Sequence, residues 1–305
     1  MNKQKKAESA EKLLTLRPTV RYTLERGGFY GWLYKSNPDY YPGKVILILG
    51  GSDGYFSQAK YIAEQFVKRG INALALGYWK QEGLPQEFCE VPLDTIEKAA
   101  ERMRMLGMKQ IGIWGISMGA LAGLHIASLR PDLFSMVVSV SGIDFTPQAF
   151  AEGKKGLPET SAFSYHGRPL PWEPLTYDRK QIAWDSLKQR QPVMTSCYSG
   201  KTDQLINPKS LIPVERISGP ILCISAKNDS FWPSAECSAR MMHHLDDAGF
   251  AYDHRLVVYE YGTHLMTPVK LQSDAYYANS RKSPEEMERA RADAMAKVFE
   301  RIARW

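Results

Sequence analysis

Short apolar runs alternate with helical patterns along this chain of 305 residues, and this alternation limits the folds available to it. The apolar run at residues 45–49 is continuous, which is typical of a strand buried on both faces of a sheet. Further strands are predicted at residues 71–78, 110–114, 135–140, 221–226 and 255–261, and helices at 55–69, 92–106, 118–129, 234–248 and from 283 onward. This alternation predicts an α/β fold in which helices cover both faces of a mostly parallel sheet.

Turn and cap signals refine this plan near the two ends of the chain. Residues 20–25 and 28–35 have the pattern of two strands joined by a turn at Arg26-Gly27-Gly28, which predicts an antiparallel hairpin. The last helix is predicted to begin at Ser283-Pro284-Glu285-Glu286, a capping box with proline at the first helical position.

The chain is long enough for one or two domains, and the continuous alternation favours one. Residues 1–14 are polar and basic and are expected to form a tail before a single domain at 15–305. The proline-rich residues 145–218 interrupt the alternation and contain a short predicted helix at 178–188. We expect this segment to be an insertion that covers one end of the sheet as a lid.

A Gly-x-Ser-x-Gly motif lies where one predicted strand meets the following helix. Its residues are Gly115, Ile116, Ser117, Met118 and Gly119. In a nucleophile elbow the serine adopts a strained backbone conformation, and a Cβ two residues to either side would collide with the turn. The motif therefore predicts that Ser117 presents its hydroxyl as a nucleophile at the positive end of a helix. The alternative is a chance match in which the serine is structural.

A serine nucleophile needs a base and a third group that orients the base. Where such an elbow is used, the acid and then the histidine follow the serine along the chain. His264 lies in a loop just after a late predicted strand and is the expected base. Asp229 follows the preceding strand and is the expected acid, or alternatively a helix cap; Asp203 and Glu236 are weaker candidates. The histidines expected to have other roles are His125, His166, His243, His244 and His254.

Attack on a carbonyl also requires donors for the oxyanion that forms. One donor is expected to be the backbone N–H of Met118, directly after the nucleophile. The second is expected from the glycine-rich loop at residues 50–54, where the Ser52 N–H is favoured. A plain glycine turn is the alternative, and a phosphate-binding loop is excluded because the loop does not end in Lys-Ser/Thr.

Several segments together resemble one known family. They are Gly50-Gly51-Ser52-Asp53-Gly54, residues 73–78 with Gly83-Leu84-Pro85, the elbow with Ala120, residues 210–215, residues 219–222 leading to Asp229 and Trp232, and Gly262-Thr263-His264. From residue 45 onward the chain resembles the C-terminal catalytic domain shared by acyl-CoA thioesterases and bile acid-CoA:amino acid N-acyltransferases, in the α/β-hydrolase superfamily. The resemblance assigns the nucleophile, acid and base to Ser117, Asp229 and His264.

The resemblance implies a serine hydrolase that cleaves an acyl thioester of the acyl-CoA type, or a carboxylic ester, through an acyl-enzyme. Two other activities stay open: a carboxylesterase or dienelactone-hydrolase-like enzyme on a non-CoA ester, and an acyl-CoA:amine N-acyltransferase. The transferase branch typically uses cysteine, so Ser117 favours water as the acceptor. Family members acting on acyl-CoA commonly carry an N-terminal β-sandwich, whereas only about 40 residues precede Val45. A binding protein with this fold is the non-enzymatic alternative.

Composition excludes other classes of protein. With 44% hydrophobic and 24% charged residues, the chain can bury a large core and is not disordered. Its formal charge of +6 is spread widely, which suits an anionic small molecule such as an acyl-CoA better than nucleic acid. We expect no membrane partner, no signal peptide, no metal and no other cofactor. The four cysteines form no C-x-x-C pair, and a cytoplasmic location is expected.

Overall fold

A central eight-stranded sheet organises the computed structural model, which describes residues 15–54, 56–151, 157–201 and 206–305. In spatial order its strands are β1 (Val20–Tyr22), β2 (Gly31–Tyr34), β4 (Asn72–Leu76), β3 (Lys44–Leu49), β6 (Gln110–Ile116), β7 (Met136–Val140), β10 (Ile221–Ala226) and β11 (His254–Tyr259). From β4 to β11 neighbouring strands are parallel, and β1 and β2 add an antiparallel edge. The predicted, mostly parallel α/β sheet is confirmed.

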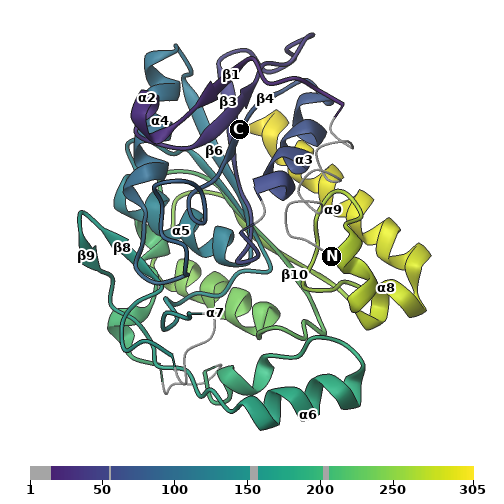
Figure 1. Ribbon diagram of the computed structural model, residues 1–305. Coiled ribbons are helices and arrows are strands. Elements are labelled where there is room, and N and C mark those ends of the chain that lie inside the picture. Colours follow the sequence, from purple (N-terminus) through teal and green to yellow (C-terminus); the bar gives the residue numbers. More distant parts are fainter. Residues whose placement is uncertain (1–14, 55, 152–156, 202–205) are drawn as a thin grey trace.

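Helices cover both faces of this sheet (Figure 1). On one face α3 (Phe56–Val67) and α9 (Pro284–Arg304) pack against the sheet, and on the other face α4 (Asp94–Met105), α5 (Met118–Leu129) and α7 (Ser234–Asp247) do so. Strand β3 supplies both cores, because Val45, Leu47 and Leu49 face one and the intervening isoleucines face the other. Within the described ranges, every helix is too short or too polar to cross a lipid bilayer.

The predicted hairpin near the N-terminus is correct in its pairing and wrong in its connection. Strands β1 and β2 are antiparallel, with Val20 opposite Leu33. The residues predicted to extend the first strand to position 25 instead form a helical turn, α2 (Leu24–Gly27). The Thr23 hydroxyl caps this turn by accepting from the Arg26 N–H, and Gly28 ends it in the left-handed conformation.

The predicted capping box at the last helix is also wrong. Pro284 is the first residue of α9, as expected, but the Ser283 side chain makes no cap hydrogen bond. A short helix that the sequence pattern did not indicate, α8 (Ala278–Lys282), runs directly into this position. The Ser283 N–H donates to the Asn279 carbonyl at 2.8 Å, so Ser283 is held as the end of α8.

The described residues of the segment 145–218 lie along the left side and the bottom of the molecule as drawn in Figure 1. They hold α6 (Arg179–Gln189), close to the predicted helix at 178–188, and short 3₁₀ turns. They also contribute β8 (Phe163–Tyr165) and β9 (Arg168–Pro169), which form a second sheet with β5 (Val91–Pro92). Because these strands have only two or three residues, no periodic pattern marks them in the sequence. The role of this segment as a lid stays a prediction.

Candidate active site

Ser117 lies at the junction of β6 and α5, in the tight turn that the glycine motif predicts. Its backbone has φ 57° and ψ −127°, a conformation that residues with a side chain rarely adopt. A Cβ on Gly115 would overlap the carbonyl of Gly119, and a Cβ on Gly119 would overlap the carbonyl oxygens of Leu49 and Gly50. Only glycine therefore fits on either side of the serine. The turn leaves Ser117 at the N-terminus of α5.

His264 follows β11 and points at the serine. Its Nε2 lies 2.9 Å from Ser117 Oγ, and both residues are buried. Two aromatic side chains hold the imidazole ring: Phe231 stacks on it with ring centres 4.7 Å apart, and Trp232 meets it edge-on at 5.4 Å. The Trp232 Nε1–H donates to the Ser141 carbonyl at 2.7 Å, which fixes the indole in turn. The ring thus has little freedom to rotate away from Ser117.

Asp229 follows β10 and completes the chain of contacts. Its two carboxylate oxygens lie 3.0 and 2.9 Å from His264 Nδ1. The carboxylate also accepts the Phe231 N–H at 2.9 Å and the Ser234 hydroxyl at 2.7 Å. The alternative prediction, that Asp229 caps a helix, is wrong, because Asp229 accepts no backbone N–H of α7. Three residues far apart in sequence therefore meet at the carboxyl ends of the parallel strands β6, β10 and β11, with β7 lying between β6 and β10.

The remaining candidates lie elsewhere or outside the described residues. His125 is buried in α5 with its Nε2 2.8 Å from Thr146 Oγ1, and burial lowers its pKa to about 3, so it stays neutral. His244 and His254 pair with acidic side chains at the surface, and Glu236 is exposed on α7. Asp203 lies outside the described residues.

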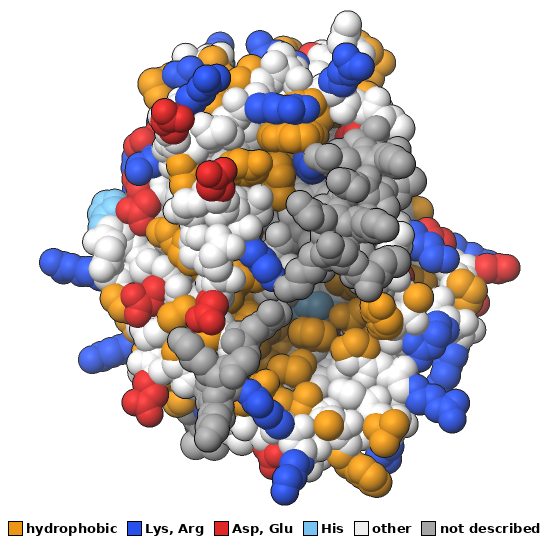
Figure 2. Space-filling model, viewed as in Figure 1, with side chains coloured by type: hydrophobic (Ala, Val, Ile, Leu, Met, Phe, Trp, Pro, Cys, Tyr) orange, Lys and Arg blue, Asp and Glu red, His pale blue; other side chains and the backbone are white. Residues whose placement is uncertain are grey.

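A cavity of about 180 Å³ opens beside Ser117. Ser52 and Met118, the residues expected to supply oxyanion donors, both line it. The glycine loop approaches the nucleophile closely, since a Cβ on Gly51 would lie 3.4 Å from the Ser117 Cβ. In Figure 2 the molecule is hollowed at the middle of the face shown, where hydrophobic side chains lie beside a histidine side chain.

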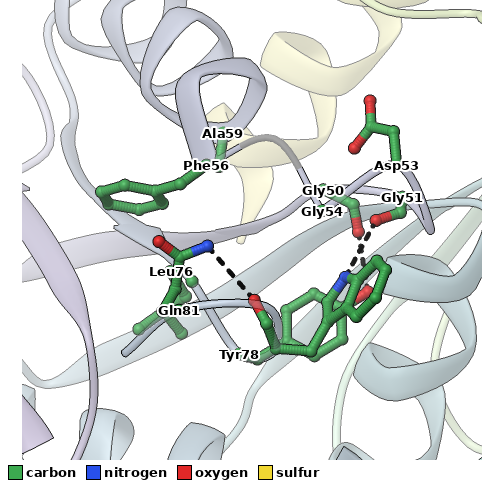
Figure 3. A pocket seen from close by; sticks show the side chains of 11 residues that line it. Gly50, Gly51, Asp53, Gly54, Phe56, Ala59, Leu76, Tyr78 and Gln81 are labelled. Atoms are coloured by element: carbon green, nitrogen blue, oxygen red, sulfur yellow. Dashed lines mark hydrogen bonds between the residues drawn. The ribbon is translucent and has the colours of Figure 1, made fainter. Parts of the chain in front are cut away.

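Tyr78 and Trp79 hold the glycine loop in place through hydrogen bonds. The sequence analysis did not assign either residue to the site. Figure 3 shows a small pocket that the loop lines together with Tyr78 and with residues of α3; its cavity of about 10 Å³ accommodates no more than about one water. The Tyr78 hydroxyl donates to the Gly50 carbonyl at 2.8 Å, and the Trp79 Nε1–H donates to the Gly51 carbonyl at 3.3 Å. The Gly51 N–H itself donates to Gln58 Oε1 at 3.2 Å. These bonds fix the part of the loop that directly precedes Ser52.

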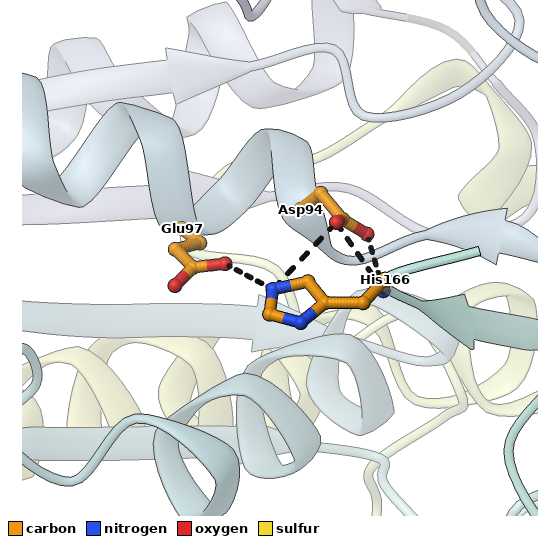
Figure 4. A group of neighbouring side chains, drawn as sticks. All are labelled: Asp94, Glu97 and His166. Atoms are coloured by element: carbon orange, nitrogen blue, oxygen red, sulfur yellow. Dashed lines mark hydrogen bonds and ion pairs between the residues drawn. The ribbon is translucent and has the colours of Figure 1, made fainter. Parts of the chain in front are cut away.

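Among the described residues, one group has the composition of a metal site: Asp94, Glu97 and His166 (Figure 4). Its acids already have partners, however. Asp94 accepts the backbone N–H of His166, whereas Glu97 pairs with Arg130 and accepts the Tyr165 hydroxyl at 3.1 Å. The group links α4 to the turn between β8 and β9, which is a structural role.

Comparison with known proteins relates the chain to one family over much of its length. The family model described as BAAT / acyl-CoA thioester hydrolase C terminal matches residues 91–270. The chain is 28% identical over 233 residues to the acyl-coenzyme A amino acid N-acyltransferase 2 of Rattus norvegicus, covering 75% of this chain and 50% of that protein. It is also 28% identical over 199 residues to the peroxisomal succinyl-coenzyme A thioesterase of Mus musculus, covering 64% and 42%. The chain thus spans about half the length of the curated relatives it matches.

Solved structures with low sequence identity share the fold. The Pyrococcus horikoshii acylaminoacyl peptidase superposes with a TM-score of 0.54 at 16% identity, covering 96% of this chain and 43% of that chain. An α/β-hydrolase enzyme named MGS-M1, from a Medee basin deep-sea metagenome library, superposes with a TM-score of 0.51 at 13% identity, covering 94% and 98%. The chain therefore has the α/β-hydrolase fold and belongs to the BAAT / acyl-CoA thioester hydrolase C-terminal family.

Proposed function

We propose that this domain hydrolyses an acyl thioester of the acyl-CoA type, or a carboxylic ester, through an acyl-enzyme on Ser117. The observation that carries the proposal is the unbroken contact chain from Ser117 Oγ through His264 to the Asp229 carboxylate, with distances of 2.9 to 3.0 Å. This is the arrangement that activates a serine hydroxyl. Family membership supports the same reaction class.

In this mechanism His264 Nε2 removes the hydroxyl proton as Ser117 Oγ attacks the carbonyl carbon. Asp229 keeps the Nδ1–H of the imidazole in place and stabilises the imidazolium that forms. The imidazolium then donates its proton to the departing thiolate or alkoxide, which leaves an acyl ester on Ser117. A water molecule activated by the same imidazole attacks that ester and releases the carboxylic acid, restoring the serine.

The oxyanion of each tetrahedral intermediate requires two donors near Ser117. The Met118 N–H is in the first turn of α5, where backbone N–H groups lack helical partners and the helix dipole favours negative charge. Ser52 lines the same cavity. The preceding N–H, of Gly51, is engaged by Gln58, which favours Ser52 as the second donor. We assign the oxyanion hole to these two backbone groups.

The proposal is tested with a fluorophosphonate probe and an activity panel. The wild-type protein is expected to react covalently with the probe and to hydrolyse acyl-CoA or p-nitrophenyl esters, and Ser117→Ala is expected to lose both properties. Ser199→Ala, at an exposed serine away from the contact chain, is the control and is expected to keep both. Labelling that survives in Ser117→Ala would place the nucleophile elsewhere, and absence of labelling in the wild type would favour a binding protein.

Transfer of the acyl group to an amine is the second candidate, because one relative is an amino acid N-acyltransferase. The two reactions share the acyl-enzyme and differ in the acceptor. Adding glycine or taurine to the assay separates them: a hydrolase yields only free acid, whereas a transferase yields amide in proportion to the amine. Turnover of p-nitrophenyl esters without any acyl-CoA turnover would identify the carboxylesterase alternative. The cytoplasmic location stays a prediction, since relatives include a peroxisomal and a mitochondrial protein.

A further inference from the structure

The cavity beside Ser117 is small and mostly apolar. Its volume is about 180 Å³, and aromatic side chains form much of its wall: Phe150, Tyr177, Tyr198, Phe231 and Trp232. An apolar cavity of roughly 150 Å³ is enough to hold benzene. At roughly 30 Å³ for each group the size of a water molecule, this cavity accommodates about six such groups. It therefore fits one aromatic ring or about six carbons of a chain.

The described lining of this cavity contains no charged side chain. Its polar groups are neutral at physiological pH, because burial raises the pKa of the Cys197 thiol and of the Tyr198 hydroxyl. Among the described lining residues, a second carboxylate on the acyl group would lose its water without gaining a cationic partner, which is strongly unfavourable. It would have to enter as the neutral acid, and for a pKa of about 4.3 that form is roughly one molecule in 500 at pH 7.

The aromatic walls are held in place from outside the cavity. Phe150 stacks on Phe88 with ring centres 5.2 Å apart and an interplanar angle of 9°. Trp232 is fixed by its bond to Ser141 and meets Tyr198 edge-on at 5.8 Å. Rigid walls cannot easily move apart for a longer chain, so the volume of the cavity becomes a limit on the acyl group.

We infer that the acyl group accepted by this domain is compact, apolar and uncharged: one aromatic ring or a chain of about six carbons. This inference rests on the proposed function and names its substrate class. It separates this site from a site for dicarboxylic acyl groups and from a site for long fatty acyl chains.

The test compares five acyl groups on one leaving group at a time, either CoA or p-nitrophenol: acetyl, hexanoyl, phenylacetyl, palmitoyl and adipoyl. Burial of each methylene is expected to raise kcat/KM about fourfold from acetyl to hexanoyl. The kcat/KM for phenylacetyl is expected to lie within about tenfold of the value for hexanoyl. The kcat/KM for palmitoyl is expected to be at least about tenfold lower than the value for hexanoyl. Adipoyl has the six carbons of hexanoyl and carries a carboxylate in place of the terminal methyl group, so its kcat/KM is expected to be roughly 100- to 500-fold lower at pH 7.

Adipoyl within tenfold of hexanoyl, or palmitoyl as the best substrate, would overturn the inference while leaving the hydrolase intact. Failure of the proposed function has a different signature: no acyl group is released, and no fluorophosphonate reacts with Ser117. The two failures are therefore distinguishable in the same set of measurements.

Two lining variants test whether the cavity itself sets the length. Met194→Ala enlarges the cavity, and the acyl chain with the highest kcat/KM is expected to become about two carbons longer. Leu175→Trp fills part of the cavity, and the preferred acyl chain is expected to become shorter. Leu187→Ala, on α6 at a side chain that is 72% exposed, is the matched control and keeps the wild-type profile. Met194→Ala provides the readout by itself if the larger tryptophan prevents folding. An unchanged length profile in a folded, probe-reactive Met194→Ala protein would overturn the inference.

Discussion

Replacing Asp229 with asparagine tests the contact chain through a single atom. One carboxylate oxygen accepts the Phe231 N–H, which holds the amide oxygen of asparagine on that side. The amide NH₂ then takes the place of the oxygen that faces Ser234 and lies 2.9 Å from His264 Nδ1, while the retained oxygen lies 3.0 Å from the same Nδ1. We expect the contact with the NH₂ to decide the tautomer. The serine hydroxyl can rotate to accept, but Nδ1 can accept only if the imidazole proton moves to Nε2. That tautomer points its N–H at Ser117 and can no longer remove the hydroxyl proton.

The expected loss follows from this change of tautomer. An incorrect tautomer lowers kcat about 10⁴-fold in serine hydrolases, which corresponds to about 5.4 kcal/mol in the activation free energy. Folding is expected to be nearly unaffected, because asparagine fills the same volume and keeps the bond to Phe231. The measurements are kcat for p-nitrophenyl hexanoate and the rate of fluorophosphonate labelling, in the variant and in the wild type. The thermal unfolding midpoint of each protein shows whether the variant is folded.

The chain offers a matched control for this substitution. Asp246 also lies against a histidine, with its Oδ1 2.9 Å from His254 Nε2, but this pair is at the surface. Asp246→Asn is expected to change kcat less than twofold, since a surface pair of this kind contributes little. A fall of less than tenfold in a folded Asp229→Asn protein would refute the proposed role of Asp229 and of the tautomer it selects.

Three further predictions concern stability and pH. Gly119→Ala is expected to lower the free energy of unfolding by more than about 3 kcal/mol, because its Cβ overlaps the carbonyl oxygens of Leu49 and Gly50; in urea unfolding, a loss near the 1 kcal/mol of an ordinary helix position would contradict this. The pKa of buried His125 lies near 3 against about 6.5 in the unfolded chain, so only the unfolded state takes up a proton as pH falls between these values. Stability is expected to decrease by up to about 1.4 kcal/mol per pH unit from about pH 6 to pH 4, and His125→Gln should remove that slope. Arg291→Met leaves the buried Asp274 carboxylate without its ion pair and is expected to cost about 3 to 5 kcal/mol, measured by denaturant unfolding; a neutral result would show that Asp274 is protonated or solvated in the variant.

The parts of the fold that the sequence predicted well are those governed by burial. Continuous apolar runs such as residues 45–49 belong to strands with both faces covered, and their position is fixed by the core on each side. The errors are local competitions between backbone and side chain. Thr23 caps a helical turn at residues where the strand pattern continues in the sequence. Ser283 is held as the last residue of α8 and therefore does not form the capping box of α9.

In the candidate site, the sheet topology determines where Ser117, Asp229 and His264 lie, whereas side-chain packing determines how they are oriented. In a parallel sheet the carboxyl ends of adjacent strands meet at one edge, so Ser117, Asp229 and His264 were predictable as neighbours from their places after three strands. The groups that fix their orientation carry no such signal. Tyr78 and Trp79 hold the glycine loop at residues 50–54, and Phe231 and Trp232 pack against the imidazole, through contacts between segments that no periodicity relates.

The cavity beside Ser117 is the part furthest from prediction, because much of its wall comes from a segment that interrupts the alternation of strands and helices. Phe150, Leu175, Met194 and Tyr198 lie within residues 145–218, where aromatic side chains are as consistent with simple packing as with a binding site. Only the three-dimensional arrangement shows that they enclose a volume next to Ser117. The positions of Ser117, Asp229 and His264 are constrained by the geometry of the sheet, whereas the insertion can change its side chains without disturbing the sheet. Proteins with the same fold can therefore share one reaction and differ in the acyl group, and under the proposed function the dimensions of this cavity set the acyl group that this chain accepts.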